Sequence, residues 1–419
     1  MKTKFSRCMF FAVALTAFAG GALAQIVQFN ATITGAQETP ATGSAATGTA
    51  TMLYDVSANT FDLVVTVNNF PNTLTNSHIH EAAPGVAGGV VSPLGAEPLY
   101  TRTGNTLTAS FFDVPYGGTK LTLLQNGAYV NFHSAAFPNG EIRGQLIAQP
   151  KRLVANLTVA QEQAAFPTVN LGGLNDYGAA VMSYNSGTGR ISLRVSVYNF
   201  NNAMNNSHFH EGAPGVSGPV VTALGNASTA GYTIVGNWIT GTFDIPYTGD
   251  VIKLLTGGAY INFHSSTFSG GECRGQVRAT DEIPGTRLTN ISTRGFVGPG
   301  NQVLIEGLVI NGPDPIRLLI TAKGPSLTAF GVTGALADPS LAIYDSAGRQ
   351  IAANDNVGTP TAGSELAIIP GVPTNSAESA LLVVLPPGVY NLVVSGNGGS
   401  GIALLEAVDL RTLGTLVTN

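Results

Sequence analysis

The chain repeats itself, and the repeat carries every histidine in the protein. The six histidines of the 419 residues form two matching sets of three: His78, His80 and His133, then His208, His210 and His264. The first two of each set lie in S-H-I-H-E-A-A-P-G-V-A-G and S-H-F-H-E-G-A-P-G-V-S-G, and the third lies in A-Y-V-N-F-H-S or A-Y-I-N-F-H-S. Corresponding histidines are 130 or 131 residues apart. Each copy is therefore long enough to be a full domain rather than a solenoid unit.

The repeat predicts a chain of four segments. We expect a leader at residues 1–24, two repeated domains at 25–149 and 151–280, and a C-terminal domain at 286–419. Three basic residues (Lys2, Lys4 and Arg7), an apolar stretch and an A-L-A cleavage site give the leader the pattern of a secretory signal peptide. The run E-I-P-G at 282–285 is the expected linker. We therefore expect an exported protein, either secreted or periplasmic.

Composition narrows the class of partner. Charged residues make up 10% of the chain and the formal net charge is −5, so a nucleic-acid partner is not expected. No stretch after the leader reaches the roughly 18 apolar residues that a membrane span needs. Cleavage of the leader leaves Cys273 as the only cysteine. The fold then has to rely on its cores rather than on internal disulfides.

Alternating side chains predict β-strands in both copies. The apolar members of the alternation are Phe61, Leu63, Val65 and Val67 in the first copy and Ile191, Leu193, Val195 and Val197 in the second. This period of two is typical of half-buried strands. Breaks rich in Asn, Gly and Pro separate short strands, and the 52 glycines argue against long helices. We expect an all-β protein in which each copy is an antiparallel Greek-key sandwich or barrel.

The C-terminal segment contains neither histidine nor cysteine. Its apolar runs predict strands at 302–310, 316–322, 341–345, 380–385, 389–395 and 402–409. Turn-forming residues separate these runs. We expect a third β-sandwich, which resembles small modules found at the C-terminal ends of many bacterial exported proteins.

The histidine motifs predict a cluster of imidazoles in each copy. On a strand, residues i and i+2 point to the same face, so His78 and His80 lie side by side. Tyr129, Asn131 and His133 share a face in the same way. If the two strands pair, three imidazoles converge, and imidazole nitrogen is a good ligand for copper or zinc. Glu81, like Glu211 in the second copy, is a candidate fourth ligand or supporting partner.

A structural role for the same residues is the competing interpretation. Histidine, asparagine and tyrosine on one strand face also form internal hydrogen-bond networks. Such a network would hold the P-G loop in place without any metal. The sequence leaves both interpretations open.

A second motif pairs opposite charges at alternating positions. Glu141-Ile-Arg143 and Glu272-Cys-Arg274 put a carboxylate and a guanidinium on one strand face. We expect an ion pair in each copy, on the sheet surface or facing a partner. Cys273 would then face the opposite way as a buried small hydrophobe.

No catalytic residue is assigned from the sequence. There is no G-x-S-x-G elbow and no phosphate-binding loop, and the histidines all belong to the repeated motifs. Paired catalytic carboxylates cannot be picked out either. The expectation is a protein that is not an enzyme.

The repeated motifs resemble the CHRD domain, which is named for chordin. The resemblance rests on S-H-I-H-E-A-A-P-G-V-A-G-G-V-V and G-A-Y-V-N-F-H-S-A-A-F-P-N-G-E-I-R-G-Q, and on their counterparts in the second copy. Gln37-Glu38 and Gln161-Glu162 fit a short Q-E element near the start of that domain. The resemblance covers about residues 25–280 and implies extracellular β-domains. In animal chordin such domains sit in an antagonist of bone morphogenetic proteins, but this chain lacks the cysteine-rich modules that accompany them there.

A weaker similarity points to copper–zinc superoxide dismutase. It rests on H-I-H-E, the P-G loop and the later G-E-I-R-G-Q strand. That similarity implies a Greek-key barrel in which His78, His80 and His133 are copper ligands. The zinc-ligand cluster and the disulfide of that enzyme have no counterpart here, so dismutase activity is not expected.

Two functions from different classes follow. The first is a secreted, non-enzymatic binding or adhesion protein whose partner is an extracellular protein, a matrix or a cell-surface ligand; a structural matrix component is a variant of it. The second is a metal-binding protein, with copper or zinc in one three-histidine site per copy, acting as an oxidoreductase of the dismutase type.

Overall fold

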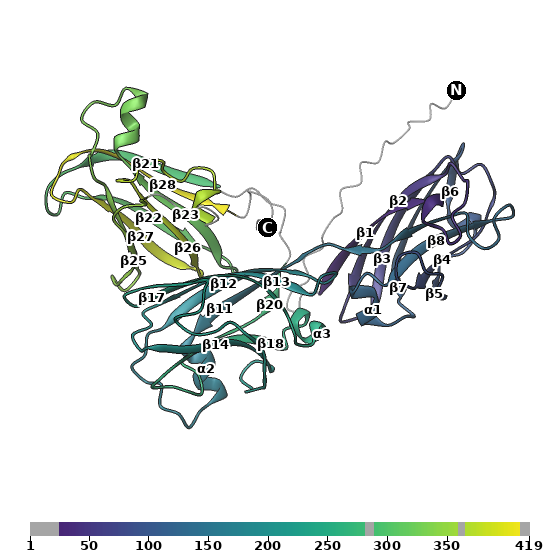
Figure 1. Cartoon of the computed structure of the whole chain (residues 1–419), viewed down its shortest axis with the longest axis horizontal. Helices are drawn as coiled ribbons and strands as arrows, with labels where there is room; N and C mark the ends of the chain where they lie inside the picture. Colours follow the sequence, from purple (N-terminus) through teal and green to yellow (C-terminus); the bar gives the residue numbers. More distant parts are fainter. Residues whose placement is uncertain (1–24, 281–288, 359–364, 411–419) are drawn as a thin grey trace, which may run out of the picture.

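The computed structural model describes residues 25–280, 289–358 and 365–410. The expected leader at 1–24 and the expected linker at 282–285 lie outside the described residues. Figure 1 shows three β units, with the first repeat (copy one) at one end and the second repeat (copy two) between it and the C-terminal unit. Among the described residues, no helix is long and apolar enough to cross a membrane.

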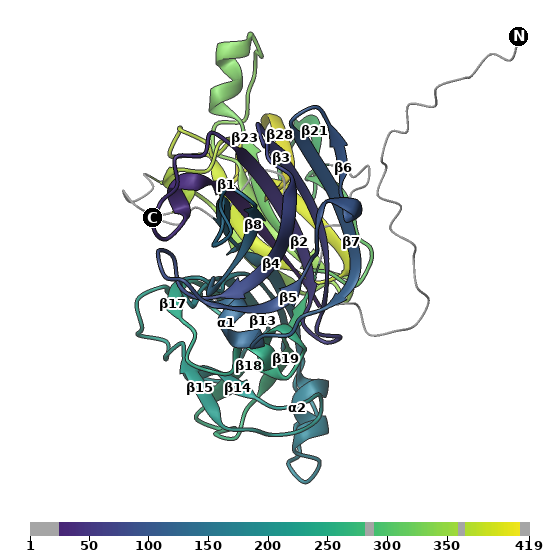
Figure 2. The same ribbon diagram turned by 90° about the vertical axis from the view of Figure 1, so that its right-hand side faces the viewer.

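Copy one is a single ten-stranded antiparallel sheet with the order β5-β4-β8-β9-β1-β2-β3-β7-β6, and with β10 also paired to β1. Its elements are β1 Ile26–Thr34, β2 Thr47–Asp55, β3 Thr60–Asn68, β4 Leu74–Glu81, β5 Gly89–Pro93, β6 Thr101–Thr103, β7 Thr106–Pro115, α1 Lys120–Leu124, β8 Ala128–Ser134, β9 Ile142–Gln145 and β10 Ile147–Ala148. The sheet curls so far that its two ends meet. A hydrogen bond joins them: Ser92 Oγ on β5 donates to the Pro115 carbonyl on β7 at 3.3 Å. Figure 2 shows this curl from the side of copy one.

Copy two repeats this sheet strand for strand, in the order β15-β14-β18-β19-β11-β12-β13-β17-β16, with β20 paired to β11. Its elements are β11 Lys151–Thr158, α2 Val159–Ala165, β12 Tyr177–Asn185, β13 Arg190–Tyr198, β14 Met204–Glu211, β15 Val220–Ala223, β16 Tyr232–Val235, β17 Trp238–Pro246, α3 Val251–Leu255, β18 Ala259–Ser265, β19 Cys273–Gln276 and β20 Arg278–Ala279. The expected all-β fold with two tandem curled domains is confirmed.

Period-two alternation explains the inner faces of both sheets. In β3 the odd-numbered residues Phe61 to Val67 are buried, while Val64 between them is 53% exposed. Aromatic rings then fill the enclosed space: Tyr100 lies edge-on to Phe111 of β7 and to Phe132 of β8. Because β7 and β8 lie in opposite halves of the sheet order, these contacts show that the core sits inside the curl.

The C-terminal unit contains two four-stranded sheets, β21-β28-β23-β26 and β22-β27-β24-β25. Its strands are β21 Asn290–Val297, β22 Leu304–Ile310, β23 Ile316–Lys323, β24 Ser340–Asp345, β25 Gln350–Asn354, β26 Ser379–Leu385, β27 Gly388–Ser395 and β28 Gly401–Asp409. All six strands expected from the sequence are present. The alternation did not reveal β21 and β25.

The C-terminal unit packs on the outer face of copy two (Figure 1). Val154, Ala179 and Val181 of that face form a buried apolar cluster with Val384 of β26. Tyr198 Oη donates to the Val384 carbonyl at 2.9 Å, and the Val384 amide donates to Ser196 Oγ at 3.1 Å. The expectation that β13 is half-buried is therefore wrong: it is buried on both faces from Ile191 to Tyr198.

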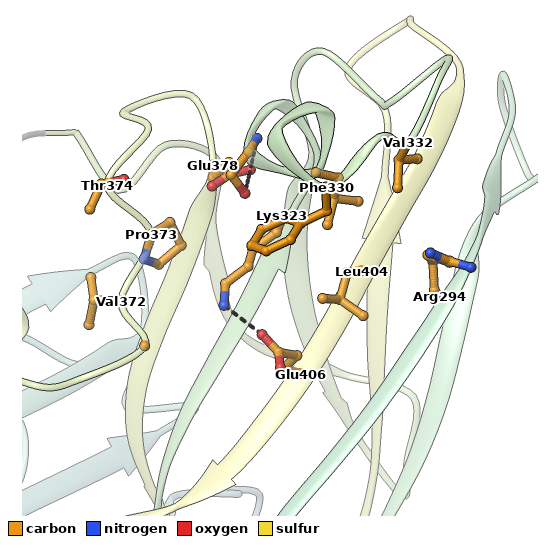
Figure 3. A pocket seen from close by; sticks show the side chains of 13 residues that line it. Arg294, Lys323, Phe330, Val332, Val372, Pro373, Thr374, Glu378, Leu404 and Glu406 are labelled. Atoms are coloured by element: carbon orange, nitrogen blue, oxygen red, sulfur yellow. Dashed lines mark hydrogen bonds and ion pairs between the residues drawn. The ribbon is translucent and has the colours of Figure 1, made fainter.

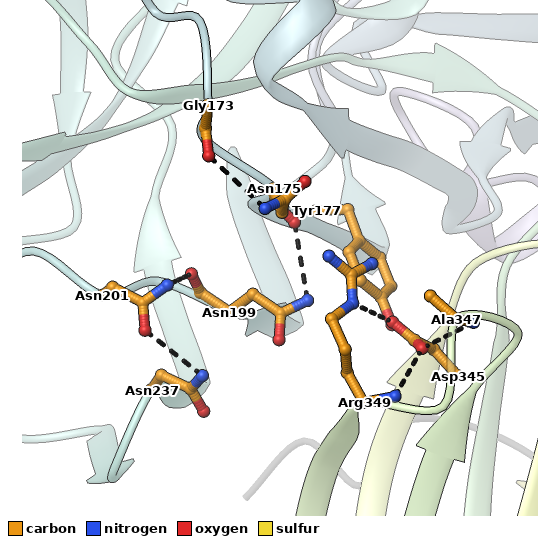
Figure 4. Close-up of polar contacts among 9 residues, drawn as sticks. All are labelled: Gly173, Asn175, Tyr177, Asn199, Asn201, Asn237, Asp345, Ala347 and Arg349. Atoms are coloured by element: carbon orange, nitrogen blue, oxygen red, sulfur yellow. Dashed lines mark hydrogen bonds and ion pairs between the residues drawn. The ribbon is translucent and has the colours of Figure 1, made fainter.

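Polar contacts extend this interface along the edge of copy two (Figure 4). Tyr177 Oη donates to the Asp345 carboxylate at 3.3 Å, and Arg349 Nε donates to the same carboxylate at 2.8 Å. Elsewhere on the interface, Glu365 accepts from Arg194 at 2.5 Å and from Arg317 at 2.7 Å. The apolar contact is thus bordered by ion pairs, as is usual where one face of a sheet is covered.

Candidate functional site

The three histidines of each copy converge because their strands are neighbours. Strand β4 pairs with β8 in a register that sets His78 opposite Asn131 and His80 opposite Tyr129. One ligand atom from each of His78, His80 and His133 lies within 4.8 Å of the others, and the same holds for His208, His210 and His264. The convergence expected from the sequence is therefore present in both copies.

In each copy, two imidazole nitrogens are as far apart as two ligands of a single metal ion would be. His78 Nδ1 lies 3.2 Å from His133 Nε2, and His208 Nδ1 lies 3.3 Å from His264 Nε2. Two nitrogens that bind one tetrahedral zinc at about 2.0–2.1 Å are about 3.3 Å apart. A hydrogen bond between two imidazoles gives a similar distance, so this separation alone does not distinguish the two interpretations.

Main-chain carbonyls fix the tautomer of two histidines in each copy. His80 Nδ1 lies 2.9 Å from the Gly88 carbonyl, and His133 Nδ1 lies 3.0 Å from the Pro138 carbonyl. A carbonyl oxygen only accepts, so Nδ1 carries the proton and Nε2 keeps its lone pair. The Gly218 and Ser269 carbonyls do the same in copy two. A ring N–H held by a carbonyl is the usual arrangement behind a metal-bound histidine.

One lone pair in each copy has no partner. The Nε2 atoms of His80 and His210 are buried and make no hydrogen bond with any described residue, and both residues are 7% exposed. A buried acceptor without a partner costs about 1–3 kcal/mol. The chain bears that cost twice, at equivalent positions.

Aromatic stacking holds the middle histidine in place. The His80 ring stacks on the Tyr129 ring, with ring centres 4.9 Å apart and an angle of 6° between the ring planes. The guanidinium carbon of Arg143 lies 3.5 Å from the centre of the same tyrosine ring. Copy two repeats this stack with His210, Tyr260 and Arg274. The Tyr129 hydroxyl also accepts from the Gly88 amide at 3.1 Å. The stack thus fixes both the ring and the loop that holds it.

The environment of His78 and His80 favours their neutral form. Burial, with smaller contributions from His133 and His80, lowers the pKa of His78 to about 4. Burial also lowers the pKa of His80, and the positive charge of Arg143 adds to the effect. A neutral imidazole is the form that binds metal.

Gly88 and Gly218, each eight residues after the second histidine of its copy, stand where there is no room for a side chain. A Cβ at Gly88 would overlap the carbonyl oxygen of Glu81, and a Cβ at Gly218 would overlap that of Glu211. Only glycine lets the P-G loop approach the strand closely enough for its carbonyl to reach His80 or His210. The sequence motif contained this glycine, but its role depends on the path of the main chain.

Glu81 and Glu211 do not join the clusters. Glu81 Oε1 accepts from Tyr116 Oη at 2.8 Å and from the Thr119 amide at 2.5 Å. Glu211 accepts from the Asp250 amide at 2.5 Å and from Lys253 Nζ at 2.7 Å. Successive residues on a strand point to opposite faces, so the carboxylate next to each histidine faces away from it. The expectation of a fourth ligand here is wrong.

The expected Glu–Arg ion pairs do not form within the described residues. Glu141 and Glu272 are buried, not on the sheet surface. Glu141 accepts from Ser134 Oγ at 2.5 Å and from Asn72 Nδ2 at 3.0 Å, while Arg143 donates to the Val86 carbonyl at 2.8 Å. Glu272 accepts from Asn202 Nδ2, and Arg274 donates to the Val216 and Ala213 carbonyls. Neither glutamate bonds to the arginine two residues further on, because both side chains are enclosed and meet other partners.

A different carboxylate lies near each arginine. Burial raises the pKa of Glu38 to about 7, against the opposing charge of Arg143. Burial likewise raises the pKa of Glu162 to about 7, against Arg274. Sequence reasoning noted the Q-E element but did not connect its glutamate with the arginine.

Cys273 has a structural role. Cys273 is fully buried, and burial raises the pKa of its thiol, as expected for a small hydrophobe.

The C-terminal unit has a cavity of about 620 Å³ that none of the predicted site residues lines. Its wall contains an ion pair in which Lys323 Nζ donates to Glu406 at 2.6 Å (Figure 3).

Comparison with known proteins agrees with the repeated geometry. The CHRD domain family model matches residues 29–146 and again residues 153–277. No curated protein matches the chain in sequence. The solved structure of the infectious bursal disease virus Gt strain is 10% identical over 94% of this chain and 75% of that chain, with a TM-score of 0.15. The two family matches together span more than half of the sequence, and the chain belongs to the CHRD domain family.

Proposed function

We propose that the protein is an exported metal-binding protein, in which each CHRD domain binds one copper or zinc ion through its three histidines. The ligands in copy one are His78 Nδ1, His80 Nε2 and His133 Nε2. The ligands in copy two are the same atoms of His208, His210 and His264. Three-histidine sets are typical of zinc, and imidazole also suits copper, which binds most tightly of the common divalent ions.

The observation that carries the proposal is the unpartnered Nε2 of the middle histidine. A hydrogen-bond network accounts for the contact between His78 and His133, because one ring can donate to the other. It does not account for His80, whose only proton is already donated to the Gly88 carbonyl and whose lone pair meets no donor in the protein. A metal ion would use all three lone pairs together. The same arrangement in copy two supports this choice independently.

The ligand set leaves one coordination position for another molecule. No fourth His, Cys, Asp or Glu side chain joins either cluster in the described part of the chain. Three protein ligands with an open position are characteristic of metal sites that bind or transform a substrate, whereas structural zinc sites have four. This supports a reactive or carrier role, and an oxidoreductase activity remains the enzymatic form of the proposal.

The proposal is tested by metal stoichiometry on the mature chain. Metal-free protein, dialysed against chelator, is titrated with Zn²⁺ and separately with Cu²⁺, and bound metal is measured by mass spectrometry of the native protein. We expect two ions per chain. His80→Phe keeps the ring stacked on Tyr129 but removes a ligand, so it should bind one ion, as should His210→Phe. The double variant should bind none at micromolar metal.

A matched control is the carboxylate beside each site. Glu81→Gln changes the residue next to His80, but its side chain faces away, so the stoichiometry should stay at two. Failure of the unaltered chain to bind either ion at micromolar concentration would make the histidines structural. In that case the binding or adhesion interpretation, with an extracellular protein or matrix as partner, would be the better one.

Export fits this function. CHRD domains are typical of extracellular proteins, and the 1–24 pattern is that of a secretory signal peptide. N-terminal sequencing of the exported protein should begin at Gln25, and a mature form that keeps Met1 would contradict export by cleavage.

A further inference from the structure

The cavity of about 620 Å³ in the C-terminal unit lies on the outer face of the sheet β21-β28-β23-β26. Three of its side chains form a row across neighbouring strands, because Arg294 of β21 pairs with Leu404 of β28, and Leu404 pairs with Lys323 of β23. Residues paired across antiparallel strands point to the same face. That face is the outer one, since Ala403 and Leu405 on either side of Leu404 belong to the core. The volume is in the usual range for a small-molecule site.

One wall of the cavity is the short 3₁₀ helix η3, Pro325–Phe330, which a buried carboxylate anchors. Glu378 is fully buried, and its Oε1 accepts from the Ser326 amide at 2.9 Å and from Ser326 Oγ at 2.7 Å. Leu327 packs inward and is 6% exposed, whereas Phe330 at the end of the helix is 84% exposed. The anchored helix therefore presents an open aromatic ring at the rim of the cavity.

The side chains around the cavity are mainly apolar. Six of them are Leu327, Phe330, Val332, Val372, Pro373 and Leu404. Removing apolar surface from water is the main driving force for binding at such a lining. The cavity therefore fits a ligand with an apolar body rather than a small hydrophilic molecule.

The charges at the cavity leave one cation unpaired. Lys323 Nζ donates to Glu406 at 2.6 Å, so these two charges offset each other. The exposed guanidinium of Arg294 has no hydrogen bond or ion pair with any described residue. Figure 3 shows Arg294 on the opposite side of the cavity from Glu378. A planar guanidinium can bind a carboxylate through two parallel hydrogen bonds. The cavity therefore combines an apolar lining with a single free site for an anionic group.

We propose that this cavity binds a free fatty acid, with one carboxylate on an unbranched alkyl chain. The carboxylate pairs with the Arg294 guanidinium. The alkyl chain lies across Leu404 and against the ring of Phe330, both of which line the cavity beside the arginine. Charge complementarity favours a carboxylate over a neutral or cationic amphiphile. The site is independent of the histidine clusters, which lie in the other two units.

The full mature chain is titrated calorimetrically with dodecanoate at low ionic strength, below the concentration at which dodecanoate forms micelles. Chelator is present, so that no metal ion at the histidine sites can bind the carboxylate. We expect saturable binding of one dodecanoate per chain. Shorter acids should bind about twofold to fourfold more weakly for each methylene removed, and added salt should weaken binding.

Two further ligands test the recognition of the carboxylate. Dodecanol and dodecylammonium should both bind more weakly than dodecanoate. The chain has a formal net charge of −5, so unspecific adsorption would favour the ammonium instead. Absence of saturable dodecanoate binding, or binding of dodecanol or dodecylammonium as tight as that of dodecanoate, would overturn the proposal.

Variants at exposed positions locate the site. Arg294→Gln should weaken dodecanoate binding on the order of tenfold, the effect of one lost charge-assisted contact, and leave dodecanol binding unchanged. Phe330→Ser should weaken the binding of both ligands. Phe296→Ser is the matched control, because Phe296 is 61% exposed and shares the outer face of β21 with Arg294 but does not line the cavity.

The control variant should bind both ligands as the unaltered chain does. All three replaced side chains are exposed, so each variant should keep the melting temperature of the unaltered chain. Equal weakening by Phe296→Ser and Phe330→Ser would show unspecific adsorption and contradict the site. Unchanged dodecanoate binding in Arg294→Gln would contradict the role of the guanidinium.

Discussion

The two CHRD copies have similar inner faces but different outer faces. Their inner faces are both largely apolar and their histidine clusters match residue by residue. The outer face of the same sheet, however, carries Thr51 and Asn68 in copy one and Val181 and Tyr198 in copy two. The copy-one residues are exposed, and their counterparts are buried under the C-terminal unit. The core and the site are thus kept by both copies, while the outer face follows whatever covers it.

This difference limits which parts can fold alone. The outer face of copy one is more polar: Thr51 and Asn68 lie on it beside the exposed apolar side chains of Leu53 and Val64. Copy two has an apolar outer face, which in isolation would be a patch of the kind that soluble monomers avoid. We therefore expect copy one to fold by itself more readily than copy two.

The largest expected effect is that of removing the C-terminal unit. A mature chain shortened to residues 25–280 would expose Val154, Val181, Tyr198 and Trp238, which are buried in the full chain. At about 1.5–3 kcal/mol for each large apolar side chain, copy two should lose on the order of 5 kcal/mol of stability or aggregate. Hydrogen exchange measured by mass spectrometry should show weaker protection of β12 and β13 but unchanged protection of β2 and β3. Equal protection of both copies would show that the cover is dispensable.

A single pair of matched substitutions gives the next largest effect. Tyr198→Ala removes a fully buried ring and its bond to the Val384 carbonyl, which should cost about 3–5 kcal/mol. Asn68→Ala, at the equivalent exposed position, should change the stability by less than about 0.5 kcal/mol. Thermal unfolding of the two variants beside the unaltered chain measures both. Similar effects from the two substitutions would mean that the outer faces do not differ in energy.

The smallest expected effect is an additional pH dependence in copy two, beyond the one that the raised pKa values of Glu38 and Glu162 give to both copies. Burial, reinforced by Glu272, raises the pKa of Asp176 well above its usual value. Copy one has Ala46 at that position, and Glu141 there accepts from Ser44, Asn72 and Ser134 instead. A carboxyl whose pKa is raised by folding binds more protons when folded, so its contribution to stability is full below about pH 4, its unfolded pKa, and falls as the pH rises through the folded pKa.

The matching measurement is the stability of each copy between pH 5 and pH 9. One proton can change the free energy of unfolding by at most about 1.4 kcal/mol per pH unit. Hydrogen exchange in copy two should become faster with rising pH beyond the intrinsic chemical effect, and Asp176→Ala should reduce that excess to the level of copy one. Copy one, in which Glu38 contributes as Glu162 does in copy two, serves as the internal control. An excess in copy one as large as that in copy two would rule out Asp176 as the cause of the difference.

The buried faces of the sheets and the histidine sites could be predicted from the sequence, because both depend on the spacing of residues along a strand. Alternation placed Phe61 to Val67 on one face, and the i, i+2 rule placed His78 beside His80. The repeat then supported each prediction twice. Features set by neighbours along a strand are readable from one chain.

Features set by distant segments were not readable in this way. The burial of Arg194 and Ser196 depends on Glu365 and Val384, which are well over a hundred residues away. The mistaken ion pair of Glu141 and Arg143 has the same origin, because a strand expected at the surface is enclosed by the loops above it. A signal did exist: Val181 and Tyr198 stand where copy one has polar residues, which becomes visible when the copies are aligned as separate sequences.

The glycine at the end of the P-G loop, where the chain returns against the histidine strand, gives a criterion for sorting other CHRD sequences. An H-x-H pair can present its second ring to a metal only if the residue eight positions further on has no side chain, since Gly88 and Gly218 both pass directly against the strand. A family member that keeps the histidines but has a larger residue there should lack the carbonyl that orients the ring. If the proposed metal sites are correct, such proteins should keep the fold but not bind metal, and this one position would separate the two kinds of relative.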